Sequence, residues 1–162
     1  MHRTPMRASL LALTISVLAS SPLLAQATSS APAIILTPAQ LSALSDTLPA
    51  ASLASIPLGR GAGYTYSFTH RDLTGVIEVH MQWTDVLVIQ SGSATLVTGG
   101  SLGGAREATP GEWRDGRMTG STSAKLRPGD VVIIPATTPH QFTLAPGDQV
   151  NYLTFKVAAA PK

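Results

Sequence analysis

Metal-binding and hydrogen-bonding side chains share one face of a predicted strand. The segment Val76–Gln82 alternates between apolar and polar residues, and its polar positions are Glu78, His80 and Gln82. Alternate residues of an extended chain point to the same side and lie about 6.5 to 7 Å apart, so Glu78 and His80 can converge on one ion. A polar face of this composition suits a cavity, and binding of a divalent metal is the chemistry expected of it.

Two further candidate ligands lie elsewhere in the chain. Asp85 follows after a turn-length gap, at the start of the next predicted strand. Adjacent strands lie about 4.8 Å apart, so Asp85 can return to the same point. His140 begins a later strand, after a loop stiffened by Pro135 and Pro139. The candidate metal ligands are therefore Glu78, His80, Asp85 and His140.

This ligand set defines a class of metal without choosing one. Two imidazoles and two carboxylates suit Mn, Fe(II), Zn or Ni and match Cu(I) poorly. Two histidines with one carboxylate suit non-haem Fe(II) oxygen chemistry, and the remaining acid is then a further ligand or a general base. We expect Gln82 and Phe142 to line the pocket, and we assign no catalytic residue.

The second half of the chain is predicted to be all-β. Short β-type runs alternate with turn signals, namely 64–69, 75–82, 85–90, 93–98, 123–127, 130–134, 141–144 and 149–157. No segment between them is a crossover helix, which argues against a parallel α/β sheet. Ser91-Gly92 is expected to be a tight hairpin turn. This spacing of short strands favours a sandwich or a barrel.

One short helix is expected before the strands. Thr37 is a candidate N-cap and Pro38 suits the first helical position. We predict three regions: a signal peptide over 1–27, an arm with this helix over 28–60, and the barrel over 61–158.

Two polar segments outside these strands have no predicted place in the site. Gly99–Gly120 is glycine-rich and charged, and is expected to be a long surface connection anchored by Trp113, with closure over the mouth of the barrel as the alternative. His70, Arg71 and Asp72 precede the first candidate strand and are expected in a solvated turn.

The N-terminus is typical of an export signal. A positive start with Arg3 and Arg7 precedes an apolar run, Ala8–Ala19, and small residues that suit cleavage after Ala27 or after Ala25. The apolar run is too short for a spanning helix, which needs about 20 residues. We therefore expect a periplasmic or secreted protein without a stable membrane anchor after cleavage.

Composition excludes several classes of function. Removal of residues 1–27 leaves nine Lys and Arg against nine Asp and Glu, so the remaining chain is near neutral and gives no support for nucleic-acid binding. The chain has no cysteine, which excludes disulfides, thiolate metal sites and a cysteine nucleophile. The expected partner is a small molecule.

Two segments of the chain resemble the paired motifs of the cupin superfamily. The first family motif is HxH, three or four residues, E, six residues, G. The matching positions here, in the same spacing, are Glu78, His80, Asp85 and Gly92. The second motif is G, five residues, PxG, two residues, H, three residues, N. Its matching positions are Gly129, Pro135, Thr137, His140 and Leu144.

Four positions depart from the family pattern. Glu78 replaces a histidine, Asp85 is one methylene shorter than the usual glutamate, and Thr137 and Leu144 replace glycine and asparagine. The chain also resembles small, single-domain, exported bacterial cupins of the type-2 kind through Thr84-Asp85 and the run Gly92–Gly100.

The resemblance implies a small antiparallel β-barrel of the jelly-roll kind over about 64–157. It also implies one metal ion held by the four candidate ligands, and a possible homodimer. Oxygenase, isomerase and lyase activities are all compatible with it. The alternative is a metal-free cupin barrel that serves as a non-catalytic binding module, in which Glu78 and Asp85 bind the ligand through hydrogen bonds.

Overall fold

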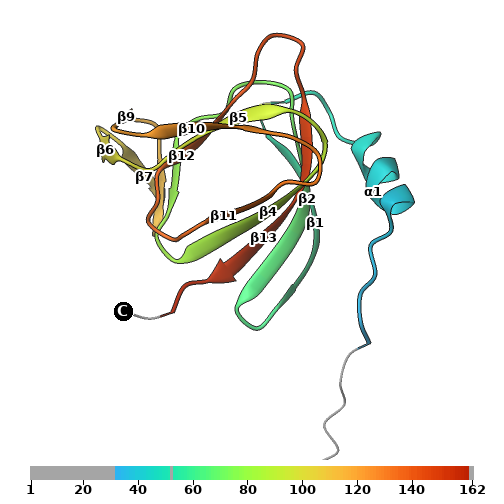
Figure 1. Ribbon diagram of the computed structural model, residues 1–162. Coiled ribbons are helices and arrows are strands. Elements are labelled where there is room, and N and C mark those ends of the chain that lie inside the picture. The colour runs from blue at the N-terminus through green and yellow to red at the C-terminus, as the bar shows by residue number, and fades with distance from the viewer. Residues whose placement is uncertain (1–31, 52, 161–162) are drawn as a thin grey trace, which may run out of the picture. The chain divides into compact units, whose positions relative to one another are not determined.

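The computed structural model describes residues 32–51 and 53–160 (Figure 1). The expected signal peptide, residues 1–27, lies outside the described residues. Among the residues that are described, no helix has the length and apolar character needed to cross a membrane.

The predicted short helix is confirmed. Helix α1 spans Pro38–Ser45, with Thr37 as N-cap and Pro38 at its start. The Thr37 side chain accepts a hydrogen bond from the Gln40 backbone, and the Gln40 side chain accepts one from the Thr37 backbone, which completes a capping box. Leu41 of α1 packs with Phe68 and Leu153, so the helix covers the outer face of one sheet.

Thirteen strands follow the helix within the described residues. They are β1 Ala54–Gly61, β2 Tyr64–Arg71, β3 Glu78–His80, β4 Trp83–Gly92, β5 Ala94–Thr98, β6 Ser101–Gly103, β7 Arg106–Thr109, β8 Glu112–Arg114, β9 Arg117–Thr119, β10 Thr122–Leu126, β11 Val131–Ile134, β12 His140–Thr143 and β13 Val150–Ala158. Each predicted run overlaps one of these strands, and β1 and β6 to β9 are additional.

Two antiparallel sheets face each other. The five-stranded sheet has the order β1-β2-β13-β4-β11, and the six-stranded sheet has the order β10-β5-β12-β3-β8-β7. A two-stranded sheet of β6 and β9 lies beside the second (Figure 1). The prediction of an all-β antiparallel jelly roll with a short helix is confirmed. Neither large sheet closes on itself, so the barrel consists of two open sheets.

The interior between the sheets changes from apolar to polar along β4 and β12. On β4 the inward residues run from Ile89 through Leu87 to Asp85, and on β12 Phe142 is followed on the same face by His140. The apolar end forms one core cluster: Leu87, Ile89, Ala94, Leu96, Leu126, Ile134, Phe142, Val150 and Tyr152. The polar end is therefore supported by a packed apolar core on the same strands.

The predicted hairpin at Ser91-Gly92 is wrong. Strand β4 belongs to the five-stranded sheet and β5 to the six-stranded sheet, so the chain changes sheets here instead of pairing back. Gly92 has φ +75°, and a Cβ atom there would lie 1.9 Å from the carbonyl oxygen of Gln149. This position therefore requires glycine for both its backbone conformation and its close approach to a neighbouring strand.

The segment Gly99–Gly120 is more ordered than its composition predicts. It contains β6 to β9, and β8 pairs with β3 in register Glu78 with Arg114 and His80 with Glu112. The expectation of a surface connection is thus wrong for β8, because that strand extends the six-stranded sheet beside the candidate ligands.

Thr137, which stands at the glycine position of the second motif, has φ +71°. A left-handed conformation costs an L-residue about 1 to 2 kcal/mol, and it is unusual for a β-branched residue. The backbone N–H of Thr137 donates to the His80 carbonyl at 2.8 Å, so the strained residue ties the second motif to β3.

We expect Thr137→Gly to raise the free energy of unfolding by about 0.5 to 1 kcal/mol, since relief of the left-handed strain exceeds the added chain entropy of glycine. Urea denaturation measures the change. Thr138→Gly is the matched control and should lower stability, because Thr138 does not have a positive φ. Equal losses in the two variants would show that Thr137 is not strained.

Candidate metal centre

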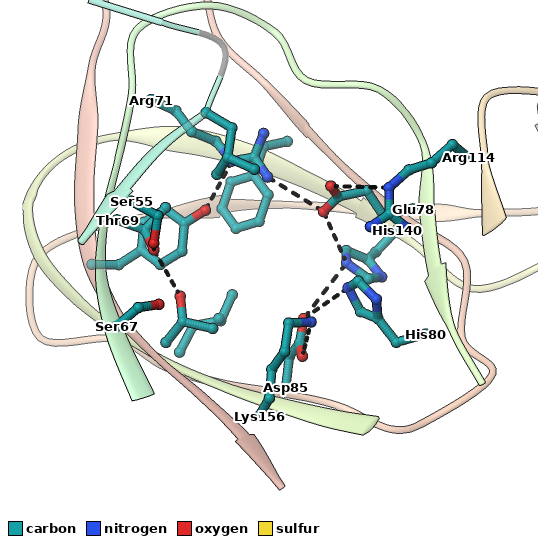
Figure 2. A pocket seen from close by; sticks show the side chains of 15 residues that line it. Ser55, Ser67, Thr69, Arg71, Glu78, His80, Asp85, Arg114, His140 and Lys156 are labelled. Carbon is teal, nitrogen blue, oxygen red and sulfur yellow. Dashed lines mark hydrogen bonds and ion pairs between the residues drawn. The ribbon is translucent and has the colours of Figure 1, made fainter. Parts of the chain in front are cut away.

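A cavity of about 140 Å³ occupies the polar end of the interior (Figure 2). Its lining combines titratable groups, hydroxyls and aromatic rings from both sheets. The lining residues are Leu53, Ser55, Ser67, Thr69, Arg71, Glu78, His80, Asp85, Leu87, Arg114, His140, Phe142, Tyr152, Thr154 and Lys156. All four predicted metal ligands are among them.

Strand pairing brings the two motifs together. Glu78 of β3 pairs with His140 of β12, so the last ligand of the second motif lies beside the first ligand of the first motif. The rings of His80 and His140 are 5.3 Å apart between centroids. Both histidines are buried, with exposed fractions of 5% and 2%. Glu78 and His140, which are 62 positions apart in the chain, therefore share one buried site.

In each histidine, the Nδ1 atom lies within hydrogen-bonding distance of an acceptor oxygen. His80 Nδ1 lies 2.5 Å from Glu112 Oε2, and His140 Nδ1 lies 3.1 Å from the Thr138 carbonyl oxygen. A carbonyl and a carboxylate accept hydrogen bonds, so in both rings Nδ1 carries the proton. The Nε2 atoms are then left to face the cavity. Metal-binding histidines in proteins are held in the same way.

The Nε2 atoms face carboxylate oxygens. His80 Nε2 lies 3.4 Å from Asp85 Oδ2, and His140 Nε2 lies 3.7 Å from Glu78 Oε2 and 3.8 Å from Asp85 Oδ2 (Figure 2). Ligands about 2.1 Å from one ion lie roughly 3 to 4.2 Å from one another, depending on the angle. These spacings fit a shared cation.

Three of the four predicted ligands form a compact group. Glu78, His80 and His140 each offer one atom within 4.8 Å of the others, which fits a divalent metal site. Asp85 comes from the opposite sheet and presents Oδ2 to both imidazoles, while its Oδ1 accepts a hydrogen bond from Lys156 at 2.9 Å. Asp85 is thus shared between the imidazole pair and a lysine.

Cationic side chains surround the carboxylates. Arg71 lies 3.3 Å from Glu78 Oε2, and Arg114 lies 3.7 Å from Glu78 Oε1 and 3.0 Å from Glu112 Oε2. Arg71 also donates to the Tyr152 hydroxyl at 2.8 Å and lies over the Phe142 ring. Each acid of the site therefore has a protein cation near it, as buried carboxylates require.

Burial and neighbouring charges shift the pKa values of these groups. Burial alone would raise the pKa of Asp85, but the hydrogen bond from His80 and the charge of Lys156 outweigh it and lower the pKa. Burial alone would also raise the pKa of Glu112, but the interactions with His80 and Arg114 outweigh it and lower the pKa. Burial lowers the pKa of His140 despite the nearby carboxylates, so this ring is neutral at pH 7. A neutral imidazole is the form of histidine that binds a metal ion, and the carboxylates beside it can bind the same ion.

Two sequence-based expectations need correction. Gln82 does not line the cavity and is exposed, because β3 ends at His80 and the chain turns before the alternation reaches Gln82. Arg71 is not in a solvated turn; with His70 it belongs to β2, and it is 3% exposed. Phe142, also named from the sequence, lies in the cavity wall.

Three site residues have no motif that reveals them. Glu112 and Arg114 come from β8, and Lys156 comes from β13. Lys156 lies on the same face of β13 as Tyr152 and Thr154, which point inward, because alternate residues of a strand share a face; this pattern would have indicated its position. No comparable pattern in the sequence pairs β8 with β3.

No family model matches the chain, and no curated protein matches it. Among solved structures, the chain is similar to the polyketide cyclase RemF from Streptomyces resistomycificus at 18% identity and TM-score 0.47, over 68% of each chain. It is similar to a cupin 2 conserved barrel domain protein from Rhodopseudomonas palustris at 19% identity and TM-score 0.47, over 68% of this chain and 63% of that one. A cupin-2 domain from Rhodospirillum rubrum gives 22% identity and TM-score 0.46, over 68% and 63% of the two chains.

The antiparallel jelly roll that the resemblance to cupins implies is confirmed. The two sheets are antiparallel and face each other, and the pairing of β3 with β12 joins the two motifs at one interior site. The four candidate ligands therefore lie inside the jelly roll.

Burial raises the pKa of Tyr152 to about 12. The neutral phenol therefore stabilises the fold below pH 10, and this contribution to stability is lost as the pH rises from about 10 to 12. We expect Tyr152→Phe to be less stable at pH 7, by about 1 to 3 kcal/mol, because Arg71 loses an acceptor. Between pH 10 and 12 the variant should lose less stability than the parent. Urea denaturation at each pH measures both effects, and parallel pH profiles would refute the assignment.

Proposed function

We propose that this chain is an exported, metal-dependent cupin-type protein that binds a small oxygen-bearing molecule in its cavity and acts on it. The observation that carries the proposal is the convergence of two imidazole Nε2 atoms with carboxylate oxygens at 3.4 to 3.8 Å. A cation bound between these nitrogen and oxygen donors would be stabilised by all of them. A divalent metal is the cation that this donor set accommodates.

Glu78, His80 and His140 would hold the ion, with Asp85 Oδ2 as a fourth donor. A bound divalent metal would supply Lewis-acid chemistry and polarise a carbonyl, enol or carboxylate of the ligand. The hydrogen bonds to Glu112 and Thr138 would keep both imidazoles oriented. Phe142 and Tyr152 would exclude water from the apolar wall of the cavity.

Export is supported by the N-terminal sequence alone. The positive start, the short apolar run Ala8–Ala19 and the small residues before Thr28 are typical of a cleaved signal peptide. A periplasmic or secreted location follows from that proposal.

A second candidate is a metal-free binding module. It is favoured by the ion pairs of the site, since Glu78 lies near Arg71 and Arg114, and Asp85 is paired with Lys156. The protein thus neutralises its own carboxylates, and the cavity would bind a ligand through hydrogen bonds. Metal content separates the two candidates.

Protein purified without chelator and without affinity histidines should contain close to one divalent metal per chain, measured by elemental analysis. His80→Ala and His140→Ala should each lose it, because each removes an imidazole donor from a site with few others. The added control is His70→Ala, which removes a histidine bonded to Asn151 outside the cavity and should leave the content unchanged. A folded, metal-free parent favours the binding module.

The contact between Glu112 and His80 provides a separate test. Glu112→Gln should weaken metal affinity by about 10- to 100-fold, because the amide no longer provides a charged acceptor for Nδ1. Competition with a chelating dye measures the affinity. Glu107→Gln is the matched control, since Glu107 is exposed and accepts a bond from Gly111 rather than from a histidine. Equal affinities of the two variants would remove Glu112 from the metal site.

A further inference from the structure

The cavity has more cationic than anionic side chains. Its lining includes two carboxylates, Glu78 and Asp85, against three cations, Arg71, Arg114 and Lys156. Glu112, which lies behind His80, balances the third cation through its contact with Arg114. The site is thus close to neutral with its own residues alone.

A divalent ion changes this balance. It would add two positive charges to a cavity whose carboxylates already compensate the protein cations. Uncompensated charge in a buried site is costly, and the cost falls if an anion enters with the ion. The charge distribution therefore favours a ligand that is itself negative.

Lys156 is placed to bind such an anion. Its ammonium group lies 2.9 Å from Asp85 Oδ1, and its side chain is 31% exposed. It lines both the inner cavity and a wider opening formed by β1, β2 and β13. Because an ion held by Asp85 competes with Lys156 for the carboxylate, metal binding would weaken the ion pair and make the ammonium group more available to a ligand.

The wall opposite the histidines offers neutral donors. Ser55, Thr69 and Thr154 form a row of hydroxyls at 3.3 and 3.2 Å across three neighbouring strands (Figure 2). Hydroxyl groups donate hydrogen bonds to carboxylate oxygens. Arg60 lines the wider opening together with Lys156 and makes no ion pair with the part of the chain that the structure describes, so it adds positive potential there.

We propose that the cavity takes a small carboxylate, held between the metal site and Lys156, and that metal and carboxylate bind cooperatively. This inference rests on the proposed metal binding. Since coupling is reciprocal, a carboxylate should tighten the binding of the metal by the same factor as the metal tightens the binding of the carboxylate.

Acetate and acetamide are suitable probes because they are nearly the same size and differ in charge. Mn²⁺ affinity is measured from the electron paramagnetic resonance signal of the free ion, with each probe at saturation. Acetate should tighten Mn²⁺ binding by about 10-fold, within the usual range of coupling, and acetamide should not. Lys156→Met should bind Mn²⁺ at least as tightly as the parent without acetate, and should lose most of the acetate effect.

Lys125→Met is the matched control, because Lys125 is exposed on β10 and does not line the cavity. It should retain the full acetate effect. Mn²⁺ binding that acetate does not tighten, or an acetate effect unchanged in Lys156→Met, overturns this inference and leaves the metal site intact. Absence of Mn²⁺ binding with and without acetate overturns the metal site and this inference together.

Discussion

The site depends on the backbone pairing of β3 with β12, which sets Glu78 opposite His140. This pairing brings the first and second sequence motifs together. A shift of one residue in register would turn Glu78 and His80 to the outer face, because side chains alternate along a strand. Strand β12 continues into the apolar core, where Phe142 is 3% exposed. The packed core therefore fixes the position of β12, and its pairing with β3 places the candidate ligands.

The polar end of the interior is a compromise between two demands. Carboxylates must be near cations to be buried, and imidazoles must be neutral to bind a metal. The site meets the first demand with Arg71, Arg114 and Lys156. Burial lowers the pKa of His140, which meets the second demand for that ring. The acceptors on both Nδ1 atoms direct the Nε2 atoms to the cavity. The protein cations that stabilise the acids in the absence of metal are also the groups that would attract an anionic ligand.

Much of the fold was predictable because local signals agreed with the final structure. The N-cap Thr37 and Pro38 indicated the helix, and short β-type runs bounded by turn signals indicated the main strands. Gly92 was recognised as a turn residue, but a turn signal does not tell whether the chain pairs back or crosses to the other sheet. That choice depends on non-local packing against Gln149.

The candidate site was predictable only in part. Motif spacing gave Glu78, His80, Asp85 and His140, all of which line one cavity. It did not give Glu112, Arg114 or Lys156, because their positions follow from strand pairing between distant segments. Gln82 was misplaced because alternation was extended past the end of β3 at His80. The sequence pattern therefore identified candidate ligands better than it identified their partners.

The most direct test of the account is X-ray absorption spectroscopy at the zinc edge on the protein loaded with one equivalent of Zn²⁺. The account predicts a first shell of nitrogen and oxygen donors at about 2.0 to 2.2 Å, with outer-shell scattering from two imidazole rings. A shell of oxygen donors alone, or scattering from a single imidazole, would contradict a shared site between His80 and His140.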